Sequence, residues 1–583
     1  MRNQSPCSRK QNITSHIKML RELSYTLVYR ALQNWRDTPT IYLHTALLLI
    51  TIVLLHAILE DAKIPRCASV YASKLPLAGL WGRLKSAIRF TSLLTEAYEK
   101  YLVRDIPCTI PDAIYGSTST LVLLPASALK WMLKQPDSVL DHHGESQQGV
   151  QEMRHLSWQA ETPFEHPVHG ASTHSWLQRW ASAQFNASKD DTMADIYDGL
   201  DRCWGSNTET WTEVDLYKSL MPIFHQYTWS AIVGASLDRN TRLWQHGYIV
   251  SIISIPASLV LHLFPARLRS TVALIVGLPS RYIFRRLEGI VMPLVQQRIS
   301  EFKSGSDRHL DDYISWAVRN DAEQRGIDAD TPRRIVSLVV SLSMLMNTSP
   351  SIVTHGLNEL LQSPRKHEYE ESLRAEIQRA LHEENGHWTK GTLAKLYGLD
   401  STLREILRLH PIAVVAPLQT AVTDVEIPIA NGEIGSIHVK AGTRIGIPAQ
   451  SIHMDEAFYE NPTEFDPFRF MPSTSSIHWN LSTPSREIKV QPHASQKKQQ
   501  ALLSPSNMWF GWGMGKSSCP GRWLAHDTLK LVLSAILMNY EIQAVGRSSP
   551  LLGQERKAPS RFGPFLPPNS RKILVRRRKN AES

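Results

Sequence analysis

The stretch WGMGKSSCPGR (residues 512–522) places one cysteine, Cys519, on a turn that contains three glycines. The next segment, RWLAHDTLKLVLSAILMNY (522–540), has the apolar spacing of a long amphipathic helix. A metal-bound thiolate needs nearby backbone N–H donors and room for a flat cofactor to approach, and glycine permits both. The start of the following helix adds a positive dipole that stabilises a thiolate. The stretch therefore predicts that Cys519 is a metal ligand. The alternative interpretation is a buried structural cysteine on a turn.

The composition of the chain limits the classes of protein to which it can belong. Its 583 residues are 42% hydrophobic, which is enough for one large core or two. The five cysteines are odd in number and widely spaced, so neither a disulfide scaffold nor a zinc site is expected. The net charge of +10 favours acidic partners such as anionic lipid or an acidic protein surface. No nucleic-acid motif accompanies the basic tail at 571–579, so no nucleic-acid partner is expected.

Near the N-terminus, the stretch IYLHTALLLITIVLLHAIL (41–59) carries no formal charge. As a helix it would be about 28 Å long, close to the thickness of a bilayer core. We therefore predict a leader at 1–40 and a transmembrane anchor at 41–59, with a buried core helix as the alternative. Basic residues lie on both sides of the stretch, so the charge rule does not decide its orientation. A second apolar stretch, 248–264, contains Pro256 and predicts a buried or membrane-dipping helix.

Beyond the anchor, the helical period dominates from about residue 85 to residue 410. One long helix is expected to start near Pro332 and to run to about residue 361, and another is expected at 393–410. Residues 413–449 are rich in Val, Ile and Thr with Gly and Pro between them, which predicts short strands. The expected fold is therefore mainly α with small β-sheets.

Three motifs together indicate one family. The cysteine stretch, with Trp512 as its aromatic residue followed by Gly515, Cys519 and Gly521, resembles the heme-binding loop F-x-x-G-x-x-x-C-x-G of the cytochrome P-450 family. The segment REILRLHP contains Glu405 and Arg408 in the spacing of the E-x-x-R motif. The segment FDPFRF (465–470) resembles the region that supplies the third member of a buried charge network, here Arg469. Two arginines around one carboxylate give bidentate pairing that would hold the loop from behind.

The resemblance implies a fold, a cofactor and a set of site residues. The fold would be the cytochrome P-450 fold, a single large helical catalytic domain (70–583) around heme b (iron protoporphyrin IX), with an N-terminal transmembrane helix. Cys519 would bind the iron. The expected cofactor-binding residues are Trp512, Gly515, Lys516, Gly521, Glu405, Arg408 and Arg469. The style of the loop resembles membrane-bound fungal enzymes of secondary metabolism.

Two positions depart from the family pattern around the heme propionates. The family usually has a cation two residues before the cysteine, where this chain has Ser517, and the adjacent Lys516 is the candidate substitute. A second frequent propionate-binding arginine position corresponds to Gln419.

The predicted distal helix departs further. Many members of the family carry an acid and an alcohol side by side, which relay protons to bound dioxygen. The matching segment here, MNTSPS (346–351), lacks the acid. The candidate catalytic residues are Asn347, as a hydrogen-bonding group, and Thr348 and Ser349, as hydroxyls. Pro350 is expected to open the helix and free carbonyl groups to hold water.

The function that the resemblance implies is a heme-thiolate monooxygenase that oxidises a lipophilic small molecule, such as a terpenoid or polyketide intermediate. It would use O2 and electrons from NADPH, delivered by NADPH–cytochrome P-450 reductase. With membrane lipid as a further partner, the expected location is the endoplasmic reticulum membrane, single-pass, with the catalytic domain facing the cytosol. Two alternatives remain open. One is a heme-thiolate isomerase or dehydratase that acts on a peroxide without a reductase, and the other is a non-catalytic, membrane-anchored heme protein.

Overall fold

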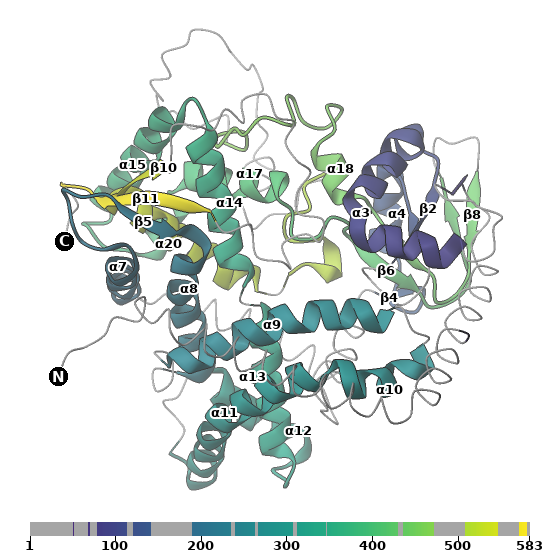
Figure 1. Ribbon diagram of the computed structural model, residues 1–583, viewed down its shortest axis with the longest axis horizontal. Helices are drawn as coiled ribbons and strands as arrows, with labels where there is room; N and C mark the ends of the chain where they lie inside the picture. The colour runs from purple at the N-terminus through teal and green to yellow at the C-terminus, as the bar shows by residue number, and fades with distance from the viewer. Residues whose placement is uncertain are drawn as a thin grey trace, which may run out of the picture. The chain divides into compact units, whose positions relative to one another are not determined.

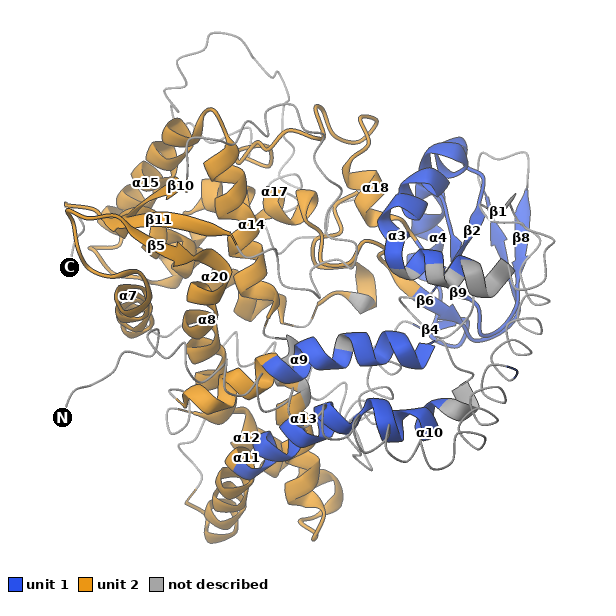
Figure 2. Cartoon of the chain, viewed as in Figure 1, with its two compact units in different colours: residues 1–162, 249–289, 419–446 blue, residues 163–248, 290–418, 447–583 orange. Residues whose placement is uncertain are grey.

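The computed structural model describes residues 51, 68–69, 78–112, 120–141, 189–234, 240–262, 266–306, 312–345, 347–429, 435–471, 508–519, 521–545 and 571–579. The predicted leader (1–40) lies outside these residues, as does the predicted anchor (41–59) except for Thr51. The described residues form many helices and three small sheets, which confirms the predicted fold class (Figure 1). They group into two compact units, made of residues 1–162, 249–289 and 419–446 and of residues 163–248, 290–418 and 447–583 (Figure 2).

The first unit contains most of the β-structure. A six-stranded sheet has the order β1-β2-β3-β9-β6-β4, and β7 and β8 form a separate antiparallel pair. The strands are β1 (Ala68–Ser69), β2 (Cys108–Pro111), β3 (Thr120–Leu123), β4 (Leu140–Asp141), β6 (Leu418–Ala421), β7 (Val425–Pro428), β8 (Ser436–Val439) and β9 (Arg444–Gly446). The last four confirm the short strands predicted at 413–449. The helices of this unit are α3 (Ala78–Lys100), α4 (Leu129–Lys134) and α10 (Ala266–Val276).

The second unit is mainly helical. Its helices are α7 (Asp190–Trp204), α8 (Leu216–Val233), α12 (Tyr313–Arg325), α13 (Thr331–Leu345), α14 (Thr348–Gln362), α15 (Lys366–Glu383), α16 (Lys390–Ala394), α17 (Tyr397–Leu409), α18 (Ala449–His453) and α20 (Arg522–Asn539). Its sheet has the order β10-β11-β5, with β10 (Tyr540–Ala544), β11 (Lys572–Arg577) and β5 (Thr212–Asp215). The basic tail at 571–579 is therefore largely the central strand of a sheet. Two helices, α9 (Thr241–His262) and α11 (Leu278–Ser304), have residues in both units.

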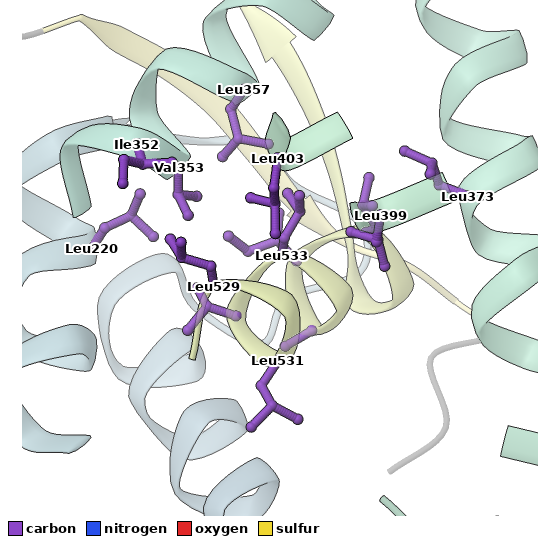
Figure 3. Packing of buried hydrophobic residues seen from close by; sticks show 14 of the residues in the cluster. Leu220, Ile352, Val353, Leu357, Leu373, Leu399, Leu403, Leu529, Leu531 and Leu533 are labelled. Carbon is purple, nitrogen blue, oxygen red and sulfur yellow. The ribbon is translucent and has the colours of Figure 1, made fainter. Parts of the chain in front are cut away.

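The core of the second unit is formed by leucines of α14, α17 and α20 with residues of α8 and α15 (Figure 3). Leu529, Leu531 and Leu533 of α20 are all buried, although Leu531 points to the opposite side of the helix from Leu529 and Leu533. Polar residues of α20 are buried as well, and among them Lys530 pairs with Asp400 at 2.7 Å. Each fully buried leucine contributes about 1.5–3 kcal/mol relative to an exposed one. The helix that follows the predicted cysteine ligand is thus anchored in the centre of this unit.

The long helix predicted from Pro332 to about residue 361 is two helices, α13 and α14, in the structure. The first ends at Leu345, Asn347 lies in a turn, and the second begins at Thr348. Pro350 explains the break, because proline has no N–H to donate to the carbonyl four residues earlier, and its ring crowds that carbonyl. The carbonyls of Asn347 and Pro350 instead accept hydrogen bonds from the Ser351 and Thr354 hydroxyls, at 3.1 and 2.7 Å. The carbonyl four residues before Pro350, that of residue 346, lies outside the described residues, so the expected water at this carbonyl stays a prediction.

The helix predicted at 393–410 is also divided, into α16 and α17. The first turn of α17 is held by a buried carboxylate of α15. Glu376 accepts hydrogen bonds from the backbone N–H groups of Gly398, at 2.7 Å, and Leu399, at 3.1 Å. These N–H groups lack partners within their own helix, so Glu376 defines where α17 begins.

Among the described residues, α9 is the one helix that is long and apolar enough to cross a membrane by length and composition. It has 22 residues and a mean hydropathy of 1.2, and 35% of its most apolar window is buried. The helix predicted at 248–264 is therefore present, but it begins earlier and runs through Pro256. Core helices meet the same criteria, so the composition of α9 does not by itself assign it to a membrane.

Candidate functional site

The cysteine turn is closed by backbone hydrogen bonds. Cys519 N–H donates to the Trp512 carbonyl at 2.8 Å, and Ser518 N–H donates to the Gly515 carbonyl at 3.3 Å. Between them lies a short 3-10 turn, η4 (Gly515–Ser517). Gly513 and Gly515 have φ values of 71° and 59°, a region that favours glycine. These bonds and glycines place Cys519 directly before the first turn of α20.

The sulfur of Cys519 lies among groups that stabilise negative charge. The backbone N–H groups of Gly521 and Arg522 donate hydrogen bonds to it, and the Arg522 guanidinium adds a positive charge nearby. Burial raises the pKa of the thiol, and these groups lower it in part. Arg522 also donates to the Cys519 carbonyl at 2.8 Å, which ties the turn to α20. The turn thus offers a sulfur ligand with its compensating donors already in position.

The other predicted residues of the turn differ in exposure. Trp512 is buried in the core of the second unit, and Cys519 packs against that core. Gly515 and Lys516 are exposed. A Cβ at Gly521 would lie 3.9 Å from the Cys519 sulfur, so a side chain there would cover the sulfur on that side. The side chain of Ser517 is not described.

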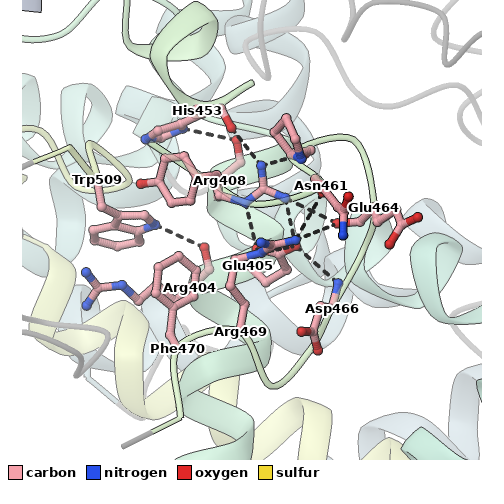
Figure 4. Close-up of polar contacts among 12 residues, drawn as sticks. Arg404, Glu405, Arg408, His453, Asn461, Glu464, Asp466, Arg469, Phe470 and Trp509 are labelled. Atoms are coloured by element: carbon pink, nitrogen blue, oxygen red, sulfur yellow. Dashed lines mark hydrogen bonds and ion pairs between the residues drawn. The ribbon is translucent and has the colours of Figure 1, made fainter. Parts of the chain in front are cut away.

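The structure brings Glu405, Arg408 and Arg469 together (Figure 4). Glu405 is fully buried and accepts two hydrogen bonds from Arg408, at 2.7 and 2.8 Å. Arg469 Nε lies 3.2 and 3.1 Å from the two oxygens of the same carboxylate, and Asp466 N–H donates to it at 3.1 Å. One carboxylate therefore accepts from two guanidinium groups and one backbone amide, which is the arrangement that the motifs predicted.

Both arginines also bind backbone carbonyls of the segment that leads to Arg469. Arg408 donates to the carbonyls of His453 and Pro462, each at 2.7 Å, and to that of Glu464 at 3.3 Å. Arg469 donates to the carbonyls of Asn461 and Glu464, both at 3.2 Å. The network thus fixes the course of residues 453–469 as well as pairing charges.

Sequence reasoning missed the residues that connect this network to the cysteine loop. His453 lies between Arg408 and the loop: its Nδ1 is 3.0 Å from the Arg408 carbonyl, and its Nε2 accepts from Phe510 N–H at 3.0 Å. The Arg408 carbonyl can only accept, so the neutral ring carries its proton on Nδ1. Burial lowers the pKa of His453 to about 3, which keeps this tautomer neutral.

Two further contacts hold the start of the loop. Tyr459 Oη donates to the Met508 carbonyl at 2.8 Å, and Trp509 Nε1 donates to the Arg404 carbonyl at 3.1 Å. The Arg404 guanidinium lies over the rings of Trp509 and Phe470, at 4.5 and 4.6 Å from their centroids. No sequence signal pointed to Arg404, because it reads as an ordinary helix cation beside the E-x-x-R motif.

The predicted catalytic residues Asn347, Thr348 and Ser349 lie at the start of α14 and are partly buried. The hydrogen bond of the Asn347 side chain leads to α8, where His225 Nε2 lies 3.2 Å from Asn347 Oδ1. Gln419 is buried in β6, in the first unit, and the cysteine loop belongs to the second unit. The structure therefore groups the cysteine loop with Glu405, Arg408 and Arg469, and groups Asn347 with a different helix.

Comparisons with known proteins agree with this geometry. The family model "Cytochrome P450" matches residues 280–573, half of the chain. The cytochrome P450 monooxygenase efuH of Hormonema carpetanum is 26% identical over 463 residues, which cover 77% of each chain. The cytochrome P450 monooxygenase fsoD of Humicola fuscoatra is 25% identical over 552 residues, covering 88% of this chain and 94% of its own. The crystal structure of the cytochrome P450DA heme domain superposes with a TM-score of 0.59 at 15% identity, over 88% of this chain and 98% of that one.

The chain therefore belongs to the cytochrome P450 family of heme-thiolate monooxygenases, and heme b is its cofactor. The residues of the cysteine turn fit a heme group. Its sulfur has the backbone donors and the guanidinium that offset thiolate charge, and the glycine at 521 leaves it uncovered on one side.

Proposed function

We propose that this chain is a membrane-anchored monooxygenase that transfers one oxygen atom of O2 to a lipophilic small molecule, a secondary-metabolite intermediate of the terpenoid or polyketide kind. The observation that carries the proposal is the Cys519 turn, backed by the buried Glu405–Arg408–Arg469 network. The fungal relatives that carry the name monooxygenase support it.

The residues of the loop would divide the work of holding the cofactor. Cys519 would bind the iron, and Gly521 and Arg522 would hold the sulfur as a thiolate through their N–H groups. Trp512 would shield the sulfur from water, and Gly515 would allow the flat ring to approach. Heme bound in this way supplies the reductive activation of O2, which thiolate donation favours.

Lys516 is exposed and is the proposed partner of a heme propionate. It would replace the cationic residue that the family usually has at the position of Ser517. The network behind the loop would keep the sulfur in place by fixing residues 453–469. The hydrogen bonds of the network are charge-assisted, and several of them share the same side chains. A small displacement of the loop would therefore break several of them at once.

On the substrate side of the heme, the proposed roles are hydrogen bonding and proton transfer, and the residues are Asn347, Thr348 and Ser349. A carboxamide does not titrate, so Asn347 would act as a donor and acceptor, and the two hydroxyls would pass protons. This difference from the acid and alcohol of many family members is also what favours the second candidate function, rearrangement or dehydration of a peroxide without a reductase.

The proposed domain organisation places a leader at 1–40, the anchor at 41–59 and the catalytic domain at 70–583. The proposed location is the endoplasmic reticulum membrane, single-pass, with the catalytic domain in the cytosol beside NADPH–cytochrome P-450 reductase. The net charge of +10 supports partners with acidic surfaces, such as a flavoprotein reductase and anionic lipid.

The deciding experiment is the reduced carbon monoxide difference spectrum of the full chain in membranes, followed by turnover with reductase. We expect the Soret maximum characteristic of thiolate-ligated heme, its loss in Cys519→Ala, and consumption of NADPH and O2 when substrate is added. A spectrum that Cys519→Ala leaves unchanged would contradict the assigned ligand. Turnover of a peroxide with no consumption of NADPH would favour the second candidate.

A further inference from the structure

A buried histidine of α8 contacts the residue that stands in place of the family's distal acid. His225 has no exposed surface, and its Nε2 lies 3.2 Å from Asn347 Oδ1. An amide oxygen only accepts hydrogen bonds, so His225 donates from Nε2 and the neutral ring leaves Nδ1 as an acceptor. Burial lowers the pKa of His225 to about 4, opposed only by the contact with Asn347, so the ring is neutral at physiological pH.

The other ring nitrogen of His225, Nδ1, is buried, and so is the indole nitrogen of Trp229. Within the described part of the chain, neither His225 Nδ1 nor Trp229 Nε1 has a hydrogen-bond partner. The two residues are four apart on α8, which places them on the same face of the helix. One nitrogen accepts and the other donates. A buried acceptor and a buried donor that share a face are what an internal water molecule satisfies.

Aromatic and hydroxyl groups fix this cluster between three elements. The ring of Trp244, on α9, stacks on His225 with centroids 6.0 Å apart and planes at 30°. Tyr217, two turns before His225 on α8, hydrogen-bonds to Ser351, whose hydroxyl donates to the Asn347 carbonyl at 3.1 Å. The turn between α13 and α14 is therefore held to α8 at both the side chain and the backbone of Asn347.

We infer that His225 is a positioning residue that holds the Asn347 carboxamide by its oxygen and, together with Trp229, binds one internal water molecule. The amide oxygen is occupied by His225, so the carboxamide presents its two N–H donors on the opposite side. This cluster replaces a titratable acid by an oriented hydrogen-bond donor. The catalytic role of His225 rests on the proposed function. The contact between His225 and Asn347 does not depend on that function.

The first experiment compares two substitutions of His225 in the reconstituted full-length enzyme. His225→Phe keeps an aromatic ring beside Trp244 and removes the N–H, whereas His225→Gln keeps a donor that can reach Asn347. We expect kcat to fall about ten- to a hundred-fold in His225→Phe with KM unchanged, because a misplaced group is costly and substrate binding is untouched. In His225→Phe, the hydrogen peroxide released per NADPH consumed should rise, which means that less NADPH oxidation is coupled to product formation. His225→Gln should restore most of this coupling.

The exposed histidine His367 provides the matched control, since 83% of its side chain is accessible. His367→Phe should behave as the wild type in every assay. Wild-type coupling in His225→Phe would overturn the inference, and so would equal impairment of the Phe and Gln variants. The reduced carbon monoxide spectrum must stay normal in all of them. Its absence in the wild type would instead count against the proposed function.

A second experiment needs no turnover and no removal of His225. Asn347→Asp places a carboxylate against the ring, which raises the pKa of the histidine towards neutrality. The ferric Soret spectrum of this variant should therefore gain a pH dependence between about pH 5.5 and 8.5 that the wild type lacks. A flat pH profile in Asn347→Asp would overturn the contact.

Trp229→Phe tests the internal water, because it removes the N–H donor and retains a ring. We expect it to shift the coupling ratio in the same direction as His225→Phe, and by less. A variant with wild-type coupling and an unchanged thermal midpoint would show that no water is held between His225 and Trp229, and this half of the inference would fall.

Discussion

At the scale of single residues, the carboxylate of Glu405 lies at the centre of the network with Arg408 and Arg469. It is fully buried and neutralises two arginines, one of which is itself fully buried. A buried ion pair contributes little relative to an apolar replacement, but removing one partner leaves an uncompensated charge in the interior. The network is therefore intolerant of single changes, even where each change is conservative in size.

The first prediction follows from this asymmetry. Glu405→Gln keeps the side-chain volume and removes the charge, so we expect it to lower the free energy of unfolding by about 3–5 kcal/mol. It should also lower the fraction of the protein that retains heme. Denaturant unfolding and the reduced carbon monoxide spectrum measure the two effects.

The control is the same substitution in an exposed pair. Glu368 pairs with Arg365 at 2.6 Å, but 33% and 46% of their side chains are accessible to solvent. Glu368→Gln should lower the free energy of unfolding by less than about 1 kcal/mol, because solvent screens such pairs. Equal losses at Glu405 and Glu368 would show that the buried network does not carry the effect assigned to it.

At the scale of secondary-structure elements, α14 and α17 approach each other closely at one glycine. A Cβ at Gly356 would lie 2.3 Å from Ile406 Cδ1 and 3.1 Å from its Cγ1. Both residues are buried, and α17 carries Glu405 and Arg408 one and two positions from this contact. Glycine at 356 therefore sets how near the helix that follows the distal turn lies to the helix of the proximal network.

The second prediction tests this contact by rescue. Gly356→Ala should destabilise the protein by about 1–3 kcal/mol, since overpacking a core forces side chains out of their preferred rotamers. Ile406→Val removes the clashing Cδ1 and by itself costs about 0.5–1.5 kcal/mol. The double variant should be more stable than the sum of the two single effects predicts, as measured by denaturant unfolding. Strict additivity would argue against the contact.

At the scale of the whole molecule, four of the described groups with a shifted pKa, three histidines and one glutamate, couple folding to pH. Burial lowers the pKa of His225 to about 4 and that of His355 and His453 to about 3, below the value near 6.5 of an unfolded histidine. Burial raises the pKa of Glu376 to about 7, opposed by its hydrogen bonds to the first turn of α17. The three histidines and the glutamate act on stability in opposite directions.

The third prediction is a loss of stability on acidification. Below pH 6.5 the unfolded histidines bind protons that the folded ones do not, so each removes about 1.4 kcal/mol per pH unit as pH falls towards its folded pKa. Glu376 contributes stability below about pH 4.5 that is lost as pH rises to about 7, so it offsets one histidine. We expect these four groups together to lower the free energy of unfolding by about 3 kcal/mol per unit between pH 6 and 5.

His453→Asn should make this pH slope shallower by the contribution of one group, whatever it does to stability at neutral pH. The same substitution at the exposed His367 should leave the slope unchanged. Denaturant unfolding at several pH values measures both. A slope that His453→Asn leaves as steep as in the wild type would contradict the assignment of a buried neutral imidazole.

The amino-acid sequence by itself determined the features that depend on local spacing. The glycines around Cys519, the spacing of Glu405 and Arg408, and the segment with Arg469 carried the resemblance to the cytochrome P-450 family, and that resemblance implied the network which the structure shows. The helical period and the strand composition at 413–449 indicated the fold class in the same way. Each of these is a pattern of neighbouring residues whose chemistry is limited by its spacing.

Only the tertiary structure decided which distant groups complete these patterns. His453 contacts Phe510 across 57 positions of the chain, and His225 contacts Asn347 across 122. Nothing in the local sequence marks either histidine: the partner of each ring fixes the position of its proton, and burial lowers its pKa. The physical reason is that the packing of several helices together sets the burial of a side chain and its hydrogen-bond partners. The sequence of one helix does not show which distant residues will cover its side chains.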